Sequence, residues 1–270
     1  MPAVSAELDR LGAVHRVVET RGSEHAREEA RAAVEAGETV AALGGDGLLR
    51  PVAQVLRGSA SALAVIPGGR GNDLARVLGI PADPIAAARV AATGRERLID
   101  MAQVDGVAYL GIASFGFDSD ANRIANEAKL IHGRLVYLYA ALRALAGWKP
   151  ARFTVTVDGE RHELSGYSVA VANSKAYGGG MLVAPQAELD DGQLDVVATG
   201  RATKVRALRG MARVFKGEHL SEPSVSTFRG RRIEVDADRP FDIYADGDPI
   251  GAVPATICVQ PRCLRVIVPA

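Results

Sequence analysis

The sequence predicts an α/β domain followed by an all-β domain, and three observations lead to this prediction. In the first hundred residues, apolar runs alternate with segments of helical periodicity. These apolar runs are nearly continuous, which is typical of parallel strands that helices cover on both faces. Most of the remaining chain consists of short strand-like segments separated by Gly, Pro and Asp. We therefore expect a three-layer α/β domain at residues 1–98 and an antiparallel β-sandwich domain with inserted helices at residues 99–270.

The elements of the first domain follow from apolar spacing and from end signals. Ser5 and Ser23 stand where side-chain caps would begin helices, and Gly37 stands where a helix would end. The expected helices span residues 4–12, 23–37, 48–58, 74–79 and 83–94. The expected strands span residues 13–20, 38–43 and 61–67.

The second domain begins with a hairpin signal in "RFTVTVDGERHELSG". Asp158 and Gly159 supply the two residues that a type I′ turn requires between paired strands. Helical regions are expected around residues 119–147 and 203–215. Further strands are expected at residues 167–174, 193–199, 231–238, 241–247, 255–261 and 264–269.

Composition excludes several classes of protein. The 270 residues carry a formal net charge of zero, so no basic field favours nucleic acid as a partner. Two cysteines, Cys258 and Cys263, match neither a zinc site nor a disulfide scaffold. No apolar run approaches the roughly 20 residues of a membrane span, and no signal peptide is recognisable. A cytoplasmic protein is therefore expected.

Two glycine loops are the most informative feature of the first domain. Each follows an expected strand and opens an expected helix, at the sheet edge where ligands of α/β proteins gather. Glycine lets a ligand approach the backbone closely, and helix N-termini present N–H groups that favour phosphate. Neither loop has the Walker A or the Rossmann pattern. The pair predicts a phosphate-binding site made of Gly44, Gly45, Asp46 and Gly47 with Gly68, Gly69, Arg70, Gly71, Asn72 and Asp73.

These loops and several later motifs resemble the diacylglycerol kinase catalytic-domain family of bacterial lipid kinases. That family is related to sphingosine kinases and, more distantly, to NAD kinases. The matching stretches are "GGDG", "PGGRGNDLARVLGIP", "VANSKAYGGGMLVAPQAELDDGQLDVV" and "YADGDPIG". The resemblance covers roughly residues 12 to 270, and the combination of motifs is highly specific.

The resemblance implies transfer of the γ-phosphate of ATP to a lipid hydroxyl, such as that of diacylglycerol, giving phosphatidic acid. Family members place this site in a cleft between a nucleotide-binding α/β domain and a β-sandwich. By position, the acid of the family's Asp-Gly-Glu motif matches Asp248, which would be the general base. Asp246 in the same turn is the second candidate for this role, and Asp46 is a further candidate catalytic residue. A Mg²⁺ site is implied at the carboxylate of Asp191 and the carbonyls of Glu188 and Gln193.

The chain departs from the family in three places. Members usually begin with an apolar strand that ends in an Asn-Pro-x-x-Gly loop, whereas this chain begins in the helix after it. Leu48 replaces a threonine whose hydroxyl would contact the nucleotide, and Pro51 replaces an acid. Arg70 replaces a threonine between the glycines of the second loop, where it could pair with phosphate. We therefore expect either that the start of the sequence is misassigned or that the α/β domain lacks one nucleotide loop and the first strand of its sheet.

These departures leave alternative functions open. The chain could be a catalytically impaired member that regulates by binding lipid or nucleotide. It could also phosphorylate another lipid alcohol, such as a sphingoid base or phosphatidylglycerol. Phosphorylation of a dinucleotide, as in NAD kinases, is disfavoured by the "DDGQLD" series and by the long β-rich second half.

A lipid kinase must draw its substrate from a bilayer. Residues 129–149 contain no acid and end in Trp148-Lys149, and residues 201–217 carry six basic residues and no acid. Such segments favour anionic surfaces, so peripheral membrane contact is expected through one of them. The alternative is that their apolar faces pack on the sandwich. A homodimer through exposed sheet edges is left open.

Overall fold

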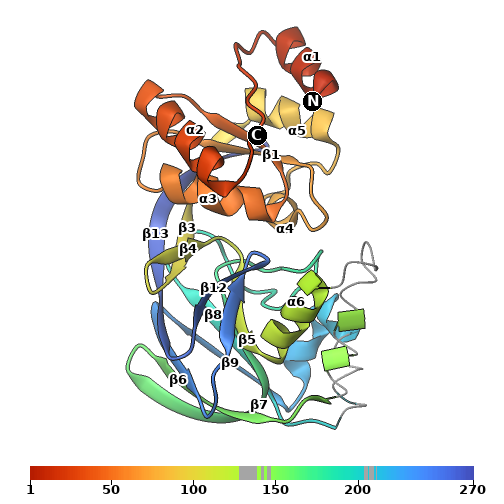
Figure 1. Cartoon of the computed structure of the whole chain (residues 1–270), viewed down its shortest axis with the longest axis vertical. Coiled ribbons are helices and arrows are strands. Elements are labelled where there is room, and N and C mark those ends of the chain that lie inside the picture. The colour runs from red at the N-terminus through yellow and green to blue at the C-terminus, as the bar shows by residue number, and fades with distance from the viewer. Residues whose placement is uncertain (128–138, 141–142, 145–146, 204–205, 207–209, 211) are drawn as a thin grey trace.

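The computed structural model describes residues 1–127, 139–140, 143–144, 147–203, 206, 210 and 212–270, which form two lobes (Figure 1). The N-lobe contains the helices and strands of residues 2–93. The C-lobe contains most of the helices and strands that follow in the chain. Large parts of the segments expected to contact a membrane, residues 129–149 and 201–217, lie outside the described residues. No helix in the described part is long and apolar enough to cross a bilayer.

The N-lobe is built on parallel strands with helices on both faces. Strand β2 pairs in parallel with β1 on one side and with β13 on the other. Leu63 and Val65 of β2 pack in a core that includes α3, whereas Ala64 packs with α5. This arrangement confirms the three-layer α/β fold. The elements are α1 (Pro2–Arg10), α2 (Ser23–Ala36), β1 (Val40–Gly44), α3 (Asp46–Leu56), β2 (Leu63–Pro67), α4 (Asp73–Val77) and α5 (Pro84–Thr93).

The C-lobe is built from antiparallel strands around a second core, as the sequence predicts for a β-sandwich-like domain. Phe115, Phe153 and Ile233 lie fully or almost fully buried in this core. Asp158 and Gly159 both adopt positive φ in the tight turn between β6 and β7, as expected. The elements are β3 (Arg95–Val104), β4 (Val107–Tyr109), β5 (Ile112–Gly116), α6 (Phe117–Glu127), β6 (Ala151–Val157), β7 (Glu160–Ala172), β8 (Leu194–Gly200), the 3₁₀ helix η1 (Glu218–Ser221), β9 (Val225–Gly230), β10 (Arg232–Ala237), β11 (Asp242–Ala245), β12 (Asp248–Ala252) and β13 (Ala255–Val268).

One long strand joins the two lobes. The sequence predicts separate strands at residues 255–261 and 264–269, but both belong to β13. The first half of β13 pairs with β10 of the C-lobe, and its last residues pair with β2 of the N-lobe. The pairing of β13 with β3 shifts between Gln260 and Leu264, so a bulge separates the two halves. Through β13 the thirteen described strands form one hydrogen-bonded sheet.

Three predictions for residues 1–37 are wrong: the strand at residues 13–20 and the helix caps at Ser5 and Ser23. Residues 13–20 form no strand, and their side chains Val14, Val17 and Val18 are exposed. Alternation alone predicts a strand, but a strand also needs a neighbour to pair with, and among the described strands β1 pairs only with β2. Helix α1 begins at Pro2 with Met1 as its N-cap, so Ser5 lies inside the helix. Gly37 ends α2 in the left-handed conformation, as expected, but Gly22 rather than Ser23 is its N-cap.

A buried hydrogen-bond network holds the junction between the lobes. The side-chain amide of Asn173 donates to the carbonyl oxygens of Asp100, at 3.2 Å, and Leu110, at 2.9 Å. The carboxylate of Asp100 accepts from the backbone N–H of Gly192, at 2.7 Å, and from that of Arg262, at 2.6 Å. Asp100 and Asn173 are both fully buried. The network thus connects β3 and β13 with the residues that directly follow β4 and β7 and with the loop before β8. The domain boundary, expected at residues 98–99, stays a prediction.

We predict that Asn173→Ala destabilises the protein by about 1–3 kcal/mol, because two buried carbonyl oxygens lose their donor. Urea unfolding followed by circular dichroism measures the change. Gln186→Ala is the matched control, because Gln186 is an exposed amide and its loss should cost no more than about 0.5 kcal/mol. Equal stability of the two variants would contradict the role assigned to the network.

Candidate active site

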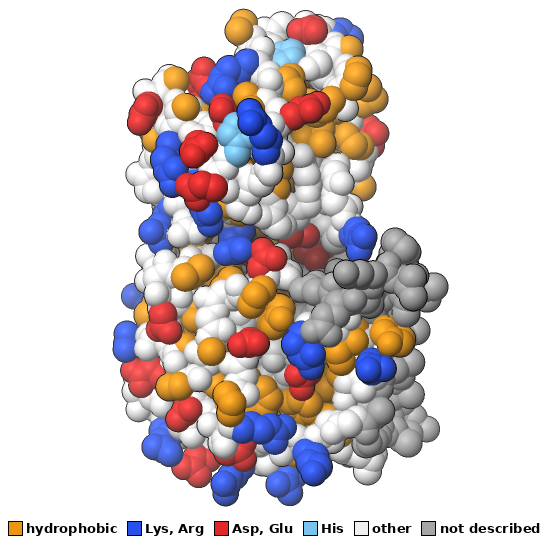
Figure 2. All heavy atoms as spheres, viewed as in Figure 1, with side chains coloured by type: hydrophobic (Ala, Val, Ile, Leu, Met, Phe, Trp, Pro, Cys, Tyr) orange, Lys and Arg blue, Asp and Glu red, His pale blue; other side chains and the backbone are white. Residues whose placement is uncertain are grey.

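A cavity of about 270 Å³ lies where the two lobes meet. The space-filling view shows a waist between the lobes with acidic side chains at its depth (Figure 2). One wall is formed by the residues that follow β1 and β2, and the opposite wall comes from the C-lobe. The lining includes Gly45, Asp46, Gly47, Arg70, Gly71, Asp73, Leu110, Gly111, Ser174, Tyr177, Gly178, Gly179, Tyr244, Asp246 and Gly247.

The two glycine loops lie side by side on the N-lobe wall. The backbone N–H of Gly68 donates to the carbonyl of Gly44 at 2.9 Å, which carries the β1–β2 pairing into the loops. A Cβ placed on Gly69 would lie 2.3 Å from the Cα of Gly45, so only glycine permits this approach. Asn72, in the left-handed conformation, accepts from the N–H of Gly69 at 2.9 Å and donates back to its carbonyl at 3.0 Å. The side chain of Asn72 therefore closes the second loop.

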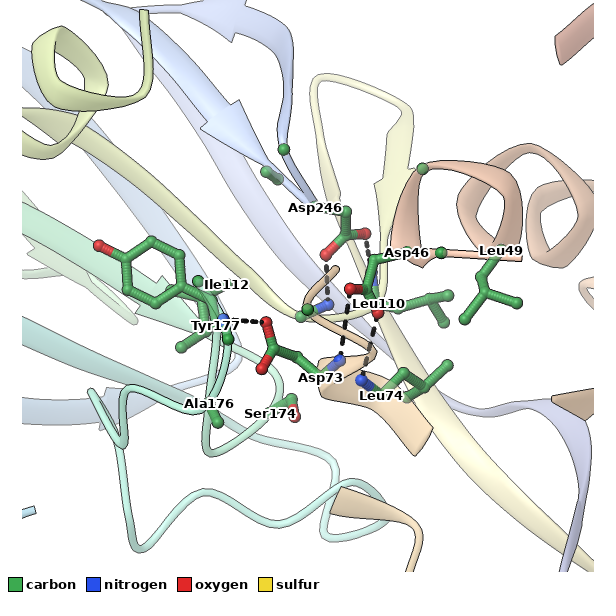
Figure 3. A pocket seen from close by; sticks show the side chains of 18 of the residues that line it. Asp46, Leu49, Asp73, Leu74, Leu110, Ile112, Ser174, Ala176, Tyr177 and Asp246 are labelled. Atoms are coloured by element: carbon green, nitrogen blue, oxygen red, sulfur yellow. Dashed lines mark hydrogen bonds between the residues drawn. The ribbon is translucent and has the colours of Figure 1, made fainter. Parts of the chain in front are cut away.

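Three carboxylates line the cavity, and each accepts hydrogen bonds from backbone N–H groups (Figure 3). The two oxygens of Asp46 accept from the backbone N–H groups of Asp73, at 3.3 Å, and Leu74, at 3.4 Å. Asp46 thereby links the first glycine loop to the first turn of α4. Asp73 Oδ2 accepts from the backbone N–H of Gly179, at 2.9 Å, so α4 is linked in turn to the C-lobe. The third carboxylate, Asp246, comes from the C-lobe.

Asp73 is buried, and this determines its electrostatics. Desolvation raises the pKa of Asp73, and the neighbouring charge of Asp46 raises it further, while the hydrogen bond from Gly179 acts in the opposite direction. Within the described part of the chain, Oδ1 of Asp73 is enclosed but has no hydrogen-bond partner. Because Asp73 lines the cavity, its carboxylate is suited to accept a proton or to bind a cation.

Asp246 lies in the tight turn between β11 and β12, where it and Gly247 both have positive φ. Its Oδ2 accepts from the N–H of Leu110 at 2.8 Å, and its Oδ1 accepts from that of Gly111 at 2.9 Å. The residue keeps some exposure to the cavity, but protein atoms surround its carboxylate. This desolvation raises the pKa of Asp246 to about 6, although the two N–H donors act to lower the pKa. Among nearby charges, Asp46 raises the pKa and Arg50 lowers it.

Asp248, expected as the general base, lies two residues further on at the start of β12. Its Oδ2 accepts from Arg50 Nη2 at 2.8 Å, and it is not part of the cavity lining. Arg50 belongs to α3, so this ion pair crosses between the lobes. Sequence reasoning missed Arg50, because no motif marks it; its only signal is its position one helical turn after Asp46.

The expected Mg²⁺ ligands Glu188, Asp191 and Gln193 lie outside the cavity lining. Both oxygens of Asp191 have protein partners. Oδ1 accepts from the backbone N–H of Gln193 at 2.9 Å, and Oδ2 forms an ion pair with Arg229. Among the described residues, no group of three or more Asp, Glu, His or Cys side chains could hold a metal ion. A cation at this loop would compete with Arg229 for Asp191 Oδ2, and the assignment of Glu188, Asp191 and Gln193 as Mg²⁺ ligands stays a prediction.

The two substitutions in the first loop have structural roles. Leu48 packs against the N-lobe core and approaches Gly44 so closely that a Cβ there would lie 2.7 Å from its Cδ2. Because α3 begins at Asp46, Pro51 lies in the second turn of the helix and is buried. Both residues therefore contribute apolar contacts where a family member would keep polar groups.

Several residues that shape the site were not among the predicted ones. Asp100 and Asn173 hold the junction, and the backbone of Leu110 and Gly111 holds Asp246. A Cβ on Gly111 would lie 2.6 Å from Asp246 Oδ1, so glycine is needed there. Asp100 had a detectable signal, because it is a single acid within the largely apolar stretch of residues 98–104. The backbone donors had none.

Two family models match the chain. The diacylglycerol kinase catalytic domain matches residues 1–104, and the YegS C-terminal NAD kinase beta sandwich-like domain matches residues 111–268. Together the two models cover both lobes.

Curated relatives match over nearly the full chain. A protein named diacylglycerol kinase from Mycobacterium tuberculosis is 36% identical over 94% of this chain and 85% of its own length. A protein from Pseudomonas aeruginosa named "Probable lipid kinase YegS-like" is 34% identical over 99% of this chain and 88% of its own length.

Solved structures share the fold. The crystal structure of a diacylglycerol kinase from Bacillus anthracis superposes with a TM-score of 0.81 at 21% identity, covering 99% of this chain and 90% of that one. An NAD kinase from Archaeoglobus fulgidus, in complex with ATP, superposes with a TM-score of 0.54 at 14% identity, covering 98% and 88%.

We predict that Gly69→Ala destabilises the protein by about 1–3 kcal/mol, because the new methyl group would overlap the backbone of Gly45. Gly47→Ala is the matched control: its Cβ would meet no atom within 4 Å. Because Gly47 lies in helix α3, alanine should leave stability unchanged or raise it by as much as about 1 kcal/mol. Chemical unfolding measures the free energy of unfolding of both variants. If Gly69→Ala is as stable as Gly47→Ala, the two loops are not closely packed.

Proposed function

The chain belongs to the diacylglycerol kinase family and is a lipid kinase, a phosphotransferase with an alcohol group as acceptor, and we propose that it transfers the γ-phosphate of ATP to the hydroxyl of diacylglycerol, giving phosphatidic acid. One observation carries this proposal: two glycine loops on one wall of a cavity face a carboxylate of raised pKa on the other wall. Donor and acceptor would therefore approach from opposite lobes.

The glycine loops are proposed to bind the phosphates of ATP. Gly45 caps α3, so the free N–H groups and the positive dipole end of that helix face the cavity. Arg70 is exposed and lines the same cavity, so its guanidinium can pair with phosphate oxygens. Phosphoryl transfer depends mainly on positioning and on neutralising charge, which amides and one arginine supply here.

Asp246 is the better candidate for the general base. It lines the cavity, whereas Asp248 is engaged by Arg50 outside it. A pKa of about 6 leaves Asp246 ionised at neutral pH yet basic enough to accept a proton. In the proposed step Asp246 takes the proton of the lipid hydroxyl while that oxygen bonds to the γ-phosphorus. The bond to the bridging oxygen breaks, and its electrons leave with ADP.

Mg²⁺ is proposed to enter with the nucleotide. The carboxylates of Asp46 and Asp73 line the cavity and are the hard oxygen donors that this ion prefers. When bound, the ion would neutralise phosphate charge. Peripheral contact with the membrane also belongs to this proposal, because the acceptor is a bilayer lipid.

The acceptor is tested directly by incubating the protein with radiolabelled ATP and Mg²⁺. Separate reactions contain diacylglycerol, a sphingoid base or phosphatidylglycerol in mixed micelles, or NAD in solution. The products are separated by thin-layer chromatography. We expect label in phosphatidic acid. Label in another lipid would redirect the substrate, and label in NAD would overturn lipid specificity. Absence of transfer to any acceptor by the folded protein would favour the impaired, lipid- or nucleotide-binding alternative.

We predict that Asp246→Asn lowers kcat by roughly 10²- to 10⁴-fold, the usual contribution of a general base. Asp248→Asn should retain measurable transfer. Because the base must be ionised, kcat/KM of the unmodified protein should fall as pH drops through about 6. Initial rates measured between pH 5 and 8.5 report this fall of kcat/KM at acid pH. If Asp248→Asn proves the more damaging substitution, the base is Asp248 and the assignment of Asp246 is wrong.

A further inference from the structure

Residues 177–181, which we call the triple-glycine hairpin, form part of the C-lobe wall of the cavity. The backbone N–H of Tyr177 donates to the carbonyl of Met181 at 3.1 Å, and the N–H of Met181 donates back at 3.0 Å. The three glycines between them all have positive φ, which glycine adopts at little cost. Tyr177 and the first two of these glycines line the cavity. The hairpin is therefore a closed loop with a defined shape.

The wall beside the hairpin is apolar. Ile112, Ala176 and Tyr177 line the cavity (Figure 3). Ile112 belongs to a buried apolar cluster of the C-lobe, and Tyr177 and Met181 pack against the same cluster. A lipid alcohol carries an apolar part next to its hydroxyl, and contact with apolar side chains stabilises that part. Because the phosphates of ATP are proposed to lie on the N-lobe wall, the lipid acceptor would meet this part of the C-lobe wall.

Residues 212–222 hold the segment that follows the hairpin. The backbone N–H of Leu182 donates to the carbonyl of Val214 at 3.0 Å. In the next residue along the chain, the carbonyl oxygen of Val183 lies 3.0 Å from His219 Nε2. Two successive residues after the hairpin are thus tied to a part of the chain more than 30 positions away, so the position of the hairpin depends on these contacts.

His219 is the buried side chain in this contact. Its Nε2 atom must donate the hydrogen bond, because the carbonyl oxygen of Val183 can only accept. Burial lowers the pKa of His219; the hydrogen bond to Val183 raises the pKa, and the positive charge of Arg213 lowers it. The ring is therefore neutral at pH 7, and its role here is that of a hydrogen-bond donor.

We propose that His219 is a positioning residue for the lipid acceptor, which holds the triple-glycine hairpin in place through Val183. This inference rests on the proposed function, in which the acceptor is a lipid alcohol. It adds a residue that the phosphate loops and the acids of the cavity do not account for. His219 is not part of the cavity lining, so it acts on the acceptor through the hairpin and touches neither substrate.

The test compares His219→Met and His219→Gln with the unmodified protein. The two new side chains have similar volumes, but only the amide of glutamine can donate to the carbonyl of Val183. Steady-state kinetics use ATP and mixed micelles that contain diacylglycerol. His219→Met should raise KM for diacylglycerol by roughly 3- to 10-fold, the equivalent of one lost hydrogen bond, and should leave KM for ATP within about 2-fold. His219→Gln should keep both KM values within about 2-fold.

His162→Met is the matched control. His162 is a partly buried histidine of the same lobe, which stacks on Phe228 at 4.1 Å and lies outside the cavity lining. Its replacement removes packing from the C-lobe but should leave both KM values unchanged. An equal rise of KM for diacylglycerol in His162→Met would show a general effect of weakening the C-lobe and would overturn the proposal. Circular dichroism verifies that each variant is folded.

Amide hydrogen exchange of the unmodified protein supplies a measurement that needs no variant, and it decides if His219→Met does not fold. Mixed micelles with diacylglycerol should slow exchange in peptides that cover residues 177–185, relative to micelles without diacylglycerol, because the acceptor would cover this wall. Slowing that is confined to other peptides would contradict the assignment of the hairpin to the acceptor.

The outcomes distinguish this inference from the function on which it rests. If the unmodified protein transfers no phosphate to any lipid, the proposed function fails. If it phosphorylates diacylglycerol and His219→Met has the same KM values as the unmodified protein, the role of His219 alone is overturned. A rise of KM for diacylglycerol that His219→Gln shares with His219→Met would also overturn that role, because the hydrogen bond to Val183 would then not be the cause.

Discussion

The carboxylate of Asp100 is the interaction on which the junction of the two lobes depends. Its oxygens satisfy the backbone N–H groups of Gly192 and Arg262, which would otherwise be buried without partners. Arg262 has positive φ within the bulge of β13, so a non-glycine residue is held there in a left-handed conformation. This carboxylate therefore stabilises the point where the shared strand passes from one core to the other, and the cavity walls are fixed on either side of it.

The lobes contribute different chemistry to the cavity. The N-lobe supplies backbone amides and a helix end, which suit phosphate, and the C-lobe supplies Asp246, held by the backbone of Leu110 and Gly111. Desolvation raises the pKa values of Asp73 and Asp246, and the negative charge of Asp46 raises both further.

The sequence predicts the fold class well because periodicity reports burial directly. Continuous apolar runs located β1 and β2, and the Asp158-Gly159 signal located the β6–β7 turn. Prediction from the sequence failed where the pairing of a strand depends on residues that are distant in the sequence. Residues 13–20 alternate but have no neighbour, and two expected strands are one because β13 bends through a bulge rather than ending. In the site, the acids and glycines were visible as motifs. Arg50 was not, because its partner Asp248 is remote in sequence and an isolated arginine carries no pattern.

The order of strands constrains how the protein can be made. In the N-lobe, β2 lies between β1 and β13, yet β13 consists of residues 255–268. While the chain is being synthesised, the first lobe therefore has only two of the strands that form its sheet, and an isolated pair of strands is marginally stable at best. The sheet of the N-lobe is therefore completed only after residues 255–268 have been synthesised. The glycine loops that follow β1 and β2 reach their final arrangement only after that point.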